Sequence, residues 1–218
     1  MSDHFSKKGI NIFKLVLIRH GQTEWNREER FRGRFDIELN ETGRRQADVT
    51  GRALRNLGIT AVYTSPLLRS LHTASIIGGF TGHEPVSLED FIDMDFGQWQ
   101  GLTPGEAKTR DEALYNVWAR TPHLAEFPGG ESLSQLHERA VSGLSRIREK
   151  HPDNTVALIS HKVVCVVLIC HVMGLDLSHF WQIEKDNCAV STFEIRRNML
   201  MIGKINDTCH LKSLDGSA

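Results

Sequence analysis

The stretch that decides the fold is Lys14-Leu15-Val16-Leu17-Ile18-Arg19-His20-Gly21-Gln22-Thr23-Glu24-Trp25-Asn26. Within it, an apolar run stops at an arginine, a histidine and a glycine. Four consecutive apolar residues bounded by polar ones are typical of a buried strand. In α/β sheets, reactive groups gather just beyond the carboxyl ends of the strands. We therefore expect the chemistry of this protein to begin at Arg19 and His20.

A second stretch repeats this design. It reads Thr155-Val156-Ala157-Leu158-Ile159-Ser160-His161, an apolar strand that delivers a second histidine. Two buried strands that end in His20 and His161 predict two imidazoles facing each other across one pocket. For either histidine alone, a polar strand end without a function is an equal alternative. The pair, with Arg19 attached, favours a site.

Length, charge and cysteine content limit the possible classes of protein. The 218 residues fit one domain of ordinary size, or one domain that carries an insertion. A formal net charge of -1 and a pI of about 6.8 provide no global field for nucleic acid or an anionic membrane. The first dozen residues lack a signal-peptide core, and no stretch reaches the roughly 18 apolar residues of a membrane helix, so we expect a cytoplasmic protein.

Four cysteines lie in the last third of the chain without C-x-x-C spacing. Two of them fall in an apolar segment, where a free cysteine behaves as a small hydrophobic residue. We therefore expect no disulfide framework. Cys170-His171 is the nearest candidate metal cluster, but no H-E-x-x-H or paired-cysteine pattern completes it, so we expect no metal and no cofactor.

Strand and helix signals alternate along the chain. Strands are expected at 61–64, at 86–88 with Phe91-Ile92, and in a closing hairpin at 189–195 and 199–205, joined by Arg197-Asn198. Helices are expected from an Asn40 or Thr42 cap to about residue 57, from Ser65-Pro66 to about residue 77, from Thr103-Pro104 to about residue 118, from Ser132 onward, and over 162–173. The alternation predicts a three-layer α/β/α sandwich with a mostly parallel sheet.

A single α/β domain is expected over residues 13–212. Residues 1–12 are polar, carry no motif and are expected to form a flexible N-terminal extension. The segment from about 95 to 130 combines a short helix with a loop that contains proline and glycine, and we expect a small helical insertion over the active site. The last residues are expected to form a tail.

Two further arginines fit the same pocket. Arg69 lies one turn into a helix that follows a strand, where backbone N–H groups already favour an anion. Arg32 and Gly33 lie a dozen residues beyond His20, near enough to fold back over it, although a solvated charged surface is an equal reading of that stretch. Arg19 and Arg69, together with two histidines and a helix N-terminus, suit a doubly charged tetrahedral anion, and phosphate is the obvious candidate.

This set of residues also predicts a reaction. A neutral histidine can attack phosphorus, and the surrounding cations favour the neutral form. The second histidine and the arginines would stabilise charge on the equatorial oxygens. A carboxyl group must protonate the departing alcohol and then activate water, and Asp93 or Asp95 can supply it.

At this point the sequence resembles a known family, the histidine phosphatase superfamily in its phosphoglycerate-mutase-like branch. Residues 17–26 resemble the family signature, and residues 64–74 resemble its second arginine motif. Phe96-Gly97-Gln98-Trp99-Gln100-Gly101 resembles the segment after the family's acid, and Ser160-His161 resembles its second histidine. These motifs follow the family's order and span residues 15 to about 175.

The resemblance implies that His20 is the phosphorylated nucleophile and that no metal is required. It implies a phosphate pocket completed by Arg19, Arg69 and His161. Further substrate contacts are expected from seven residues, namely Gly21, Gln22, Thr23, Asn26, Arg32, Gly33 and Lys162.

Two positions depart from the family pattern. Asp93 stands where this branch usually has glutamate, one methylene longer, so Asp93 approaches more closely or Asp95 shares the role. Lys162 stands where glycine is common, and it either adds a cation at the edge of the pocket or points outward.

The leading hypothesis is a phosphomonoesterase that acts on a small phosphorylated metabolite and interacts with neither nucleic acid nor membrane. A phosphoglycerate mutase is the alternative within the family. The short segment after the acid resembles the phosphatase branch and favours hydrolysis. From another class, a non-catalytic module could use the pocket to bind a phosphorylated partner, but binding alone needs no nucleophile flanked by an acid. The resemblance suggests a homodimer, and the sequence leaves substrate and oligomeric state open.

Overall fold

The computed structural model describes residues 12–196 and 199–214. Its six-stranded sheet has the order β3-β2-β4-β1-β5-β6. Four strands are parallel, namely β1 (Ile12–Arg19), β2 (Ile59–Thr64), β3 (Pro85–Ser87) and β4 (Thr155–Ser160). The remaining two, β5 (Val190–Arg196) and β6 (Met199–Asp207), are antiparallel and form one edge. The predicted α/β fold with a mostly parallel sheet is confirmed.

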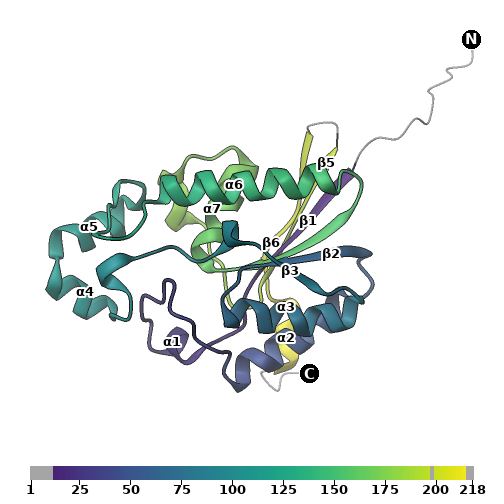
Figure 1. The fold of residues 1–218 in the computed structure, drawn as a ribbon, viewed down its shortest axis with the longest axis horizontal. Helices are drawn as coiled ribbons and strands as arrows, with labels where there is room; N and C mark the ends of the chain where they lie inside the picture. The colour runs from purple at the N-terminus through teal and green to yellow at the C-terminus, as the bar shows by residue number, and fades with distance from the viewer. Residues whose placement is uncertain (1–11, 197–198, 215–218) are drawn as a thin grey trace, which may run out of the picture.

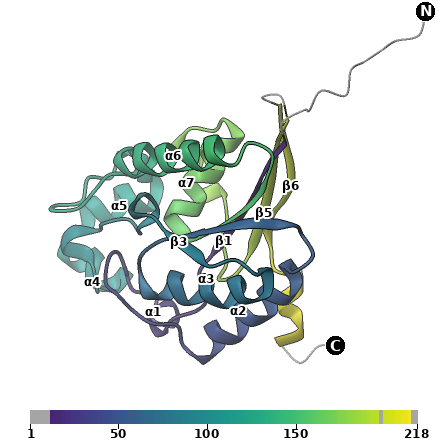
Figure 2. The same ribbon diagram turned by 45° about the vertical axis from the view of Figure 1, so that its right-hand side comes forward.

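Helices cover both faces of the sheet (Figure 1, Figure 2). One face carries α2 (Glu41–Leu54) and α3 (Leu68–Thr81), and the other carries α6 (Leu133–Lys150) and α7 (Lys162–Met173). Alternate residues of β1 divide between two cores: Leu15 and Leu17 pack in the cluster that includes α6 and α7, whereas Val16 and Ile18 pack with α2 and α3. Successive side chains of a strand point to opposite faces, so the unbroken apolar run requires a helical layer on each side.

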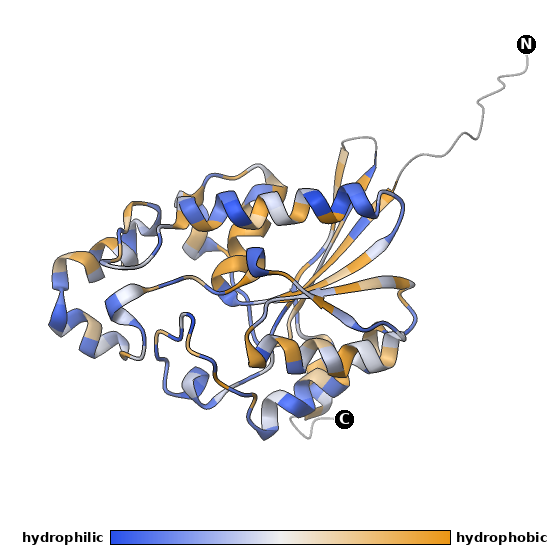
Figure 3. Cartoon of the chain, viewed as in Figure 1, coloured by the Kyte–Doolittle hydropathy of each residue, from blue (hydrophilic) through white to orange (hydrophobic). Residues whose placement is uncertain are grey.

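Hydropathy follows these layers. Figure 3 shows hydrophobic residues along the central strands and hydrophilic residues on the outer side of α6. The remaining helices, α1 (Glu24–Arg27), α4 (Pro104–Arg110) and α5 (Glu112–Arg120), lie beyond the carboxyl end of β1 (Figure 1). Within the described residues, no helix is long and apolar enough to cross a membrane. All four cysteines are free thiols.

Several helix boundaries follow the predicted signals. Asn40 accepts a hydrogen bond from the backbone N–H of Gly43 and caps α2, whereas Thr42 lies inside that helix. Thr103 and Ser132 each form a capping box, at the start of α4 and of α6. Helix α7 ends at Gly174, as predicted.

The helix after β2 differs from the prediction at both ends. It begins at Leu68, with Leu67 as the N-cap residue. The Ser65 hydroxyl is shared between His161 and the N–H of Leu67, and the first-turn N–H of Leu68 is accepted by the distant Asp36 carboxylate at 2.7 Å. The helix continues past Gly78-Gly79 and ends at Gly82, whose φ of 76° provides the left-handed C-cap.

Other boundaries were also predicted wrongly. Phe91 belongs to a 3₁₀ turn (Glu89–Phe91) and not to a strand, since its backbone N–H bonds to Leu88 O within the turn. The helix from Pro104 breaks at Asp111, whose extended backbone and side chain cap α5.

The chain ends also differ from the expectation. The expected tail contains a 3₁₀ helix (Cys209–Leu214), in which His210 Nε2 lies 3.0 Å from Thr50 Oγ1 of α2. The expected N-terminal extension lies outside the described residues except for Ile12, which begins β1. The expected hairpin turn at 197–198 also lies outside them.

Candidate active site

Parallel pairing of β1 with β4 brings the two predicted histidines together. Arg19 lies opposite Ser160 in the ladder, and the backbone N–H of His20 donates to Ser160 O at 2.8 Å. His20 and His161 are fully buried, and their ring centroids lie 5.2 Å apart. Both therefore leave neighbouring strands at the same edge of the sheet, which is where an α/β fold collects its ligands.

The tautomer of His20 follows from its local backbone. Nδ1 lies 2.6 Å from the carbonyl oxygen of Gly21, which can only accept, so Nδ1 carries the proton. Nε2 therefore carries the lone pair, and it has no hydrogen-bond partner in the described part of the chain. Burial lowers the pKa of His20 well below its usual value, and the nearby Arg69, His161 and Arg19 lower it further. His20 thus presents a neutral, unpartnered nitrogen.

His161 is held through both ring nitrogens. Nδ1 accepts a hydrogen bond from Arg69 Nε at 3.2 Å, so the proton resides on Nε2, which donates to Ser65 Oγ at 2.7 Å. Burial, followed by the charges of Arg69 and Arg32, lowers the pKa of His161 well below its usual value. This histidine is neutral as well, but with the opposite tautomer.

Arg69 connects His161 to the predicted acid. Besides its bond to His161, it donates to the carbonyl oxygens of Gly33 and Phe35 and to Asp93 Oδ2, the last at 2.9 Å. The other oxygen of Asp93 accepts the backbone N–H of Met94. Burial lowers the pKa of Arg69, and the Asp93 carboxylate opposes that effect. A buried charge of this kind requires a partner, and Asp93 provides it.

The side chains of Arg19 and Arg32 line the same cavity, and each guanidinium group has an N–H donor left for a ligand. Arg19 Nη1 donates to Lys185 O at 2.7 Å, whereas its Nε and that of Arg32 lack a partner among the described residues. Burial lowers the pKa of Arg32 to about 9, and the neighbouring Arg19 contributes to the shift. Unsatisfied buried guanidinium N–H groups are costly, which is expected where an anionic ligand completes the bonding.

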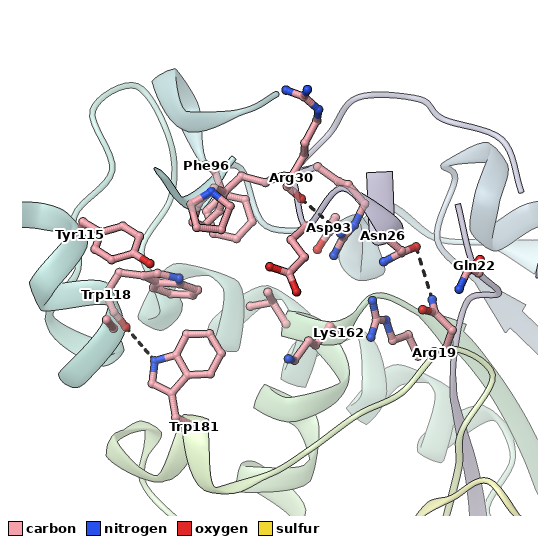
Figure 4. Close-up of a pocket in the computed structure, with 17 residues that line it drawn as sticks. Arg19, Gln22, Asn26, Arg30, Asp93, Phe96, Tyr115, Trp118, Lys162 and Trp181 are labelled. Carbon is pink, nitrogen blue, oxygen red and sulfur yellow. Dashed lines mark hydrogen bonds between the residues drawn. The ribbon is translucent and has the colours of Figure 1, made fainter. Parts of the chain in front are cut away.

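A cavity of about 610 Å³ is lined by Arg19, Arg32 and Asp93. The predicted residues His20, Arg69 and His161 are fully buried and are not part of its wall. Figure 4 shows Arg19, Gln22, Asn26 and Lys162 on its polar side, which Asp93 also lines. Its opposite wall is aromatic and is formed mainly by Phe96, Tyr115, Trp118 and Trp181, to which the segment at 95–130 contributes the first three. The pocket thus joins a cationic end to an apolar end.

Three of the predicted contact residues shape the pocket and do not line it. Gly21 holds His20 through its carbonyl oxygen, and Gly33 does the same for Arg69. Thr23 is buried as the N-cap of α1, where it bonds to Asn26. Asp95 is also absent from the cavity wall, since its carboxylate accepts the N–H of Gly97 and lies 3.5 Å from Arg34.

Several site residues escaped the sequence reasoning. Ser65 was predicted only as a helix cap; its hydroxyl accepts the N–H of Leu67 at 3.3 Å and is also the partner of His161. The signal for it existed, because Ser65 directly follows β2 as the histidines follow their strands. The side chain of Asn187 donates to His20 O at 2.9 Å, and Lys185 holds Arg19, but these residues lie in an irregular loop with no local signal.

Comparison with known proteins agrees with this geometry. The model of the histidine phosphatase superfamily (branch 1) matches residues 15–208. The chain belongs to this superfamily. Phosphoserine phosphatase 1 of Hydrogenobacter thermophilus, a histidine phosphatase relative, is 34% identical over 200 residues, which cover 92% of this chain and 95% of that protein.

Solved structures of histidine phosphatases share the fold. Bacillus stearothermophilus YhfR superposes with a TM-score of 0.87 at 29% identity, covering 91% of this chain and 99% of that one. Phosphoserine phosphatase of Entamoeba histolytica, solved in complex with 3-phosphoglyceric acid, superposes with a TM-score of 0.81 at 26% identity over 91% and 99% of the two chains. The described residues of this histidine phosphatase hold no cluster of three or more His, Cys, Asp or Glu side chains suited to a metal ion.

Proposed function

We propose that this protein is a phosphomonoesterase that hydrolyses a small phosphorylated metabolite through a phosphohistidine on Nε2 of His20. The observation that carries the proposal is the buried Nε2 lone pair, which is unpartnered in the described part of the chain and surrounded by Arg19, Arg32 and Arg69. A neutral imidazole is nucleophilic, and the cations around it stabilise charge on the phosphoryl oxygens as the transition state forms.

The first step forms the phosphoenzyme. Nε2 of His20 attacks phosphorus, the ester P–O bond breaks, and the departing alkoxide oxygen takes a proton from the Asp93 carboxyl group. The proton stays on Nδ1 of His20 and is donated to the Gly21 carbonyl oxygen, which stabilises the positive charge that develops on the ring. His161, neutral and engaged at both ring nitrogens, holds Arg69 in place without adding charge, and its Nε2–H can reach a phosphoryl oxygen only if that oxygen replaces Ser65 Oγ as the acceptor.

Phosphate binding has to compete with Asp93 for Arg69. Four hydrogen bonds from Arg69 already end on protein acceptors, one of them Asp93 Oδ2. A phosphate dianion that takes over Arg69 places negative oxygens beside the released carboxylate, and this repulsion favours uptake of the proton that the leaving group needs.

The second step releases phosphate. The Asp93 carboxylate takes a proton from water as the water oxygen attacks phosphorus, the P–N bond breaks, and its electron pair returns to Nε2 of His20. Asp93 is then protonated again for the next cycle. We propose that no metal takes part, because the arginines supply the positive charge that a metal would otherwise provide.

The experiment is to trap the phosphoenzyme in the presence of EDTA. After mixing with O-phosphoserine and quenching in alkali, mass spectrometry is expected to find one added phosphoryl group on His20, and none in His20→Asn. His137→Asn, at a half-buried histidine of α6 whose ring contacts His171 of α7, serves as the matched control and is expected to retain the label. Label on another residue, or activity of His20→Asn near that of the wild type, would contradict the proposal.

A product assay separates hydrolysis from isomerisation. With 3-phosphoglycerate and a bisphosphoglycerate primer, we expect free phosphate to appear faster than 2-phosphoglycerate. Isomerisation that depends on the primer and outpaces phosphate release would identify a mutase.

A further inference from the structure

Lys162 lies on the wall of the cavity, directly after His161 in the sequence. It begins α7, and Figure 4 places its side chain between Arg19 and Trp181. Burial lowers the pKa of the Lys162 ammonium, and the charges of Arg19 and Arg32 lower it further. Three cations therefore share one side of this pocket.

No ion pair joins Lys162 to a carboxylate in the described ranges of the chain. The negative charges that oppose the lowering of its pKa belong to Glu184 and Asp186, both exposed in the loop before β5. Without a bound anion, this environment disfavours the charged form of Lys162, because the ammonium is half-buried beside like charges. An anion placed next to it would reverse that balance.

Trp181 fixes the position of the ammonium. Lys162 Nζ lies 5.6 Å from the centroid of the Trp181 ring, a cation–π contact, and Trp181 Nε1 donates to Trp118 O at 2.7 Å. The indole is thereby anchored to α5, and the lysine is held over it at the pocket. Figure 4 shows this hydrogen bond and the lysine beside it.

The charges of the lining exceed what a phosphate group requires. In the protein alone, the Asp93 carboxylate balances Arg69. When a phosphate dianion takes over Arg69, Asp93 and the phosphate together still carry one negative charge fewer than the positive charges of Arg19, Arg32, Arg69 and Lys162. Among the other charged groups on the wall, Arg30 is paired with Glu28 and Glu106, and Glu29 is exposed. One positive charge thus remains for one further negative charge on the substrate.

We infer that Lys162 binds a carboxylate of the substrate and selects phosphomonoesters that carry a carboxylate near the ester oxygen. This inference rests on the proposed phosphatase function. A carboxylate supplies the single negative charge and accepts charge-assisted hydrogen bonds from the ammonium. Lys162 then contributes to specificity, while the phosphoryl group is handled by the groups around His20.

The experiment compares two substrates that differ only at this group. 3-Phosphoglycerate and glycerol 3-phosphate share a three-carbon phosphate ester, and only the first has a carboxylate. We expect the wild type to hydrolyse 3-phosphoglycerate with the higher kcat/KM, and Lys162→Met to reduce the ratio of the two kcat/KM values roughly 10- to 100-fold, mainly through KM, because a hydrogen bond to a charged group is lost. General damage to the site lowers both values and leaves their ratio unchanged.

Two further variants sharpen the result. Lys162→Arg, which keeps a cation, is expected to retain most of the discrimination, whereas Lys108→Met, which removes an exposed lysine of α4 paired with Glu112, is expected to leave the ratio as in the wild type. Equal use of both substrates by the wild type, or an unchanged ratio in Lys162→Met, would overturn the inference and leave the phosphatase standing. Absence of phosphate release from these substrates and from p-nitrophenyl phosphate would reject the proposed function itself.

Discussion

Replacing Asp93 with asparagine removes the negative charge of a buried ion pair and nearly preserves its shape. Asp93 is 3% exposed, its Oδ2 lies 2.9 Å from Arg69 Nη2 and 3.6 Å from His161 Nδ1, and its Oδ1 accepts the N–H of Met94. An amide oxygen can replace one of these acceptors, but it can neither balance Arg69 nor donate the proton that the leaving alcohol requires. The substitution therefore affects both stability and chemistry.

The structure sets the size of both effects. Removing one partner of a buried ion pair typically costs about 3–5 kcal/mol. Arg69 keeps its bonds to Gly33, Phe35 and His161, so we expect Asp93→Asn to lose about 2–3 kcal/mol of unfolding free energy, below that range. Loss of a general acid typically reduces the rate by about 10² to 10⁴, and this loss should be confined to substrates whose alcohol leaves poorly.

The assay compares kcat/KM for O-phosphoserine, an alkyl ester, with that for p-nitrophenyl phosphate, whose phenolate departs without a proton. We expect Asp93→Asn to slow the alkyl ester at least about 100-fold more than the aryl ester. Asp95→Asn is the matched control, because Asp95 does not line the cavity and binds the N–H of Gly97. It is expected to reduce both rates equally or not at all. Guanidinium denaturation of each variant checks the stability loss.

One result would refute the reasoning about Asp93. If Asp93→Asn slows both esters by the same factor, then the carboxylate acts by holding Arg69 in place and does not supply the proton. A selective loss in Asp95→Asn would transfer the role to Asp95.

Two further predictions concern pH and backbone. Burial lowers the pKa values of His20 and His161 well below the unfolded value of about 6.5, so the unfolded chain binds more protons than the folded protein as the pH falls, and stability falls with it. Between about pH 7.5 and 5.5 we expect the wild type to lose up to about 3 kcal/mol relative to a variant with both histidines replaced by glutamine, measured by denaturation, and parallel curves would contradict this. At Gly97, φ is 51° and an added Cβ would lie 2.2 Å from a backbone carbonyl oxygen, so Gly97→Ala should lower the free energy of unfolding by about 2–5 kcal/mol. Gly105 lies in α4 with open space beside it, so Gly105→Ala should raise the free energy of unfolding by about 0.5–1 kcal/mol. Equal effects at the two sites would show that the loop around Gly97 shifts to accommodate the added methyl group.

The site residues that could be predicted are those whose position is determined by the local sequence of the strand or helix that carries them. His20 and His161 follow apolar runs that can only be buried strands, and the carboxyl ends of parallel strands meet at one edge of the sheet. Arg69 lies in the first turn of α3, the helix that follows a third parallel strand, β2. Strand and helix patterns were therefore sufficient to predict these residues together, without knowledge of strand order.

The rest depends on contacts between distant segments. Lys185 is buried near the end of the chain, its ammonium bonded to the carbonyl oxygens of Leu17 and Ala189 while its own carbonyl oxygen accepts Arg19. A lysine between polar residues normally indicates an exposed loop, so its sequence context predicts the opposite of its burial. The start of α3 was misplaced for the same reason, since its capping group, Asp36, comes from another loop.

The two histidines show how equivalent positions in a fold acquire different chemistry. Each directly follows a parallel strand, each is fully buried and each is neutral. His20 bonds to the carbonyl oxygen of its own neighbour, which fixes the proton on Nδ1 and leaves Nε2 unpartnered among the described residues. His161 is engaged at both nitrogens, by Arg69 and by Ser65. Attack on phosphorus requires a lone pair that no protein donor occupies, so hydrogen bonding alone, without reference to the family, supports His20 as the nucleophile and His161 as its neutral companion.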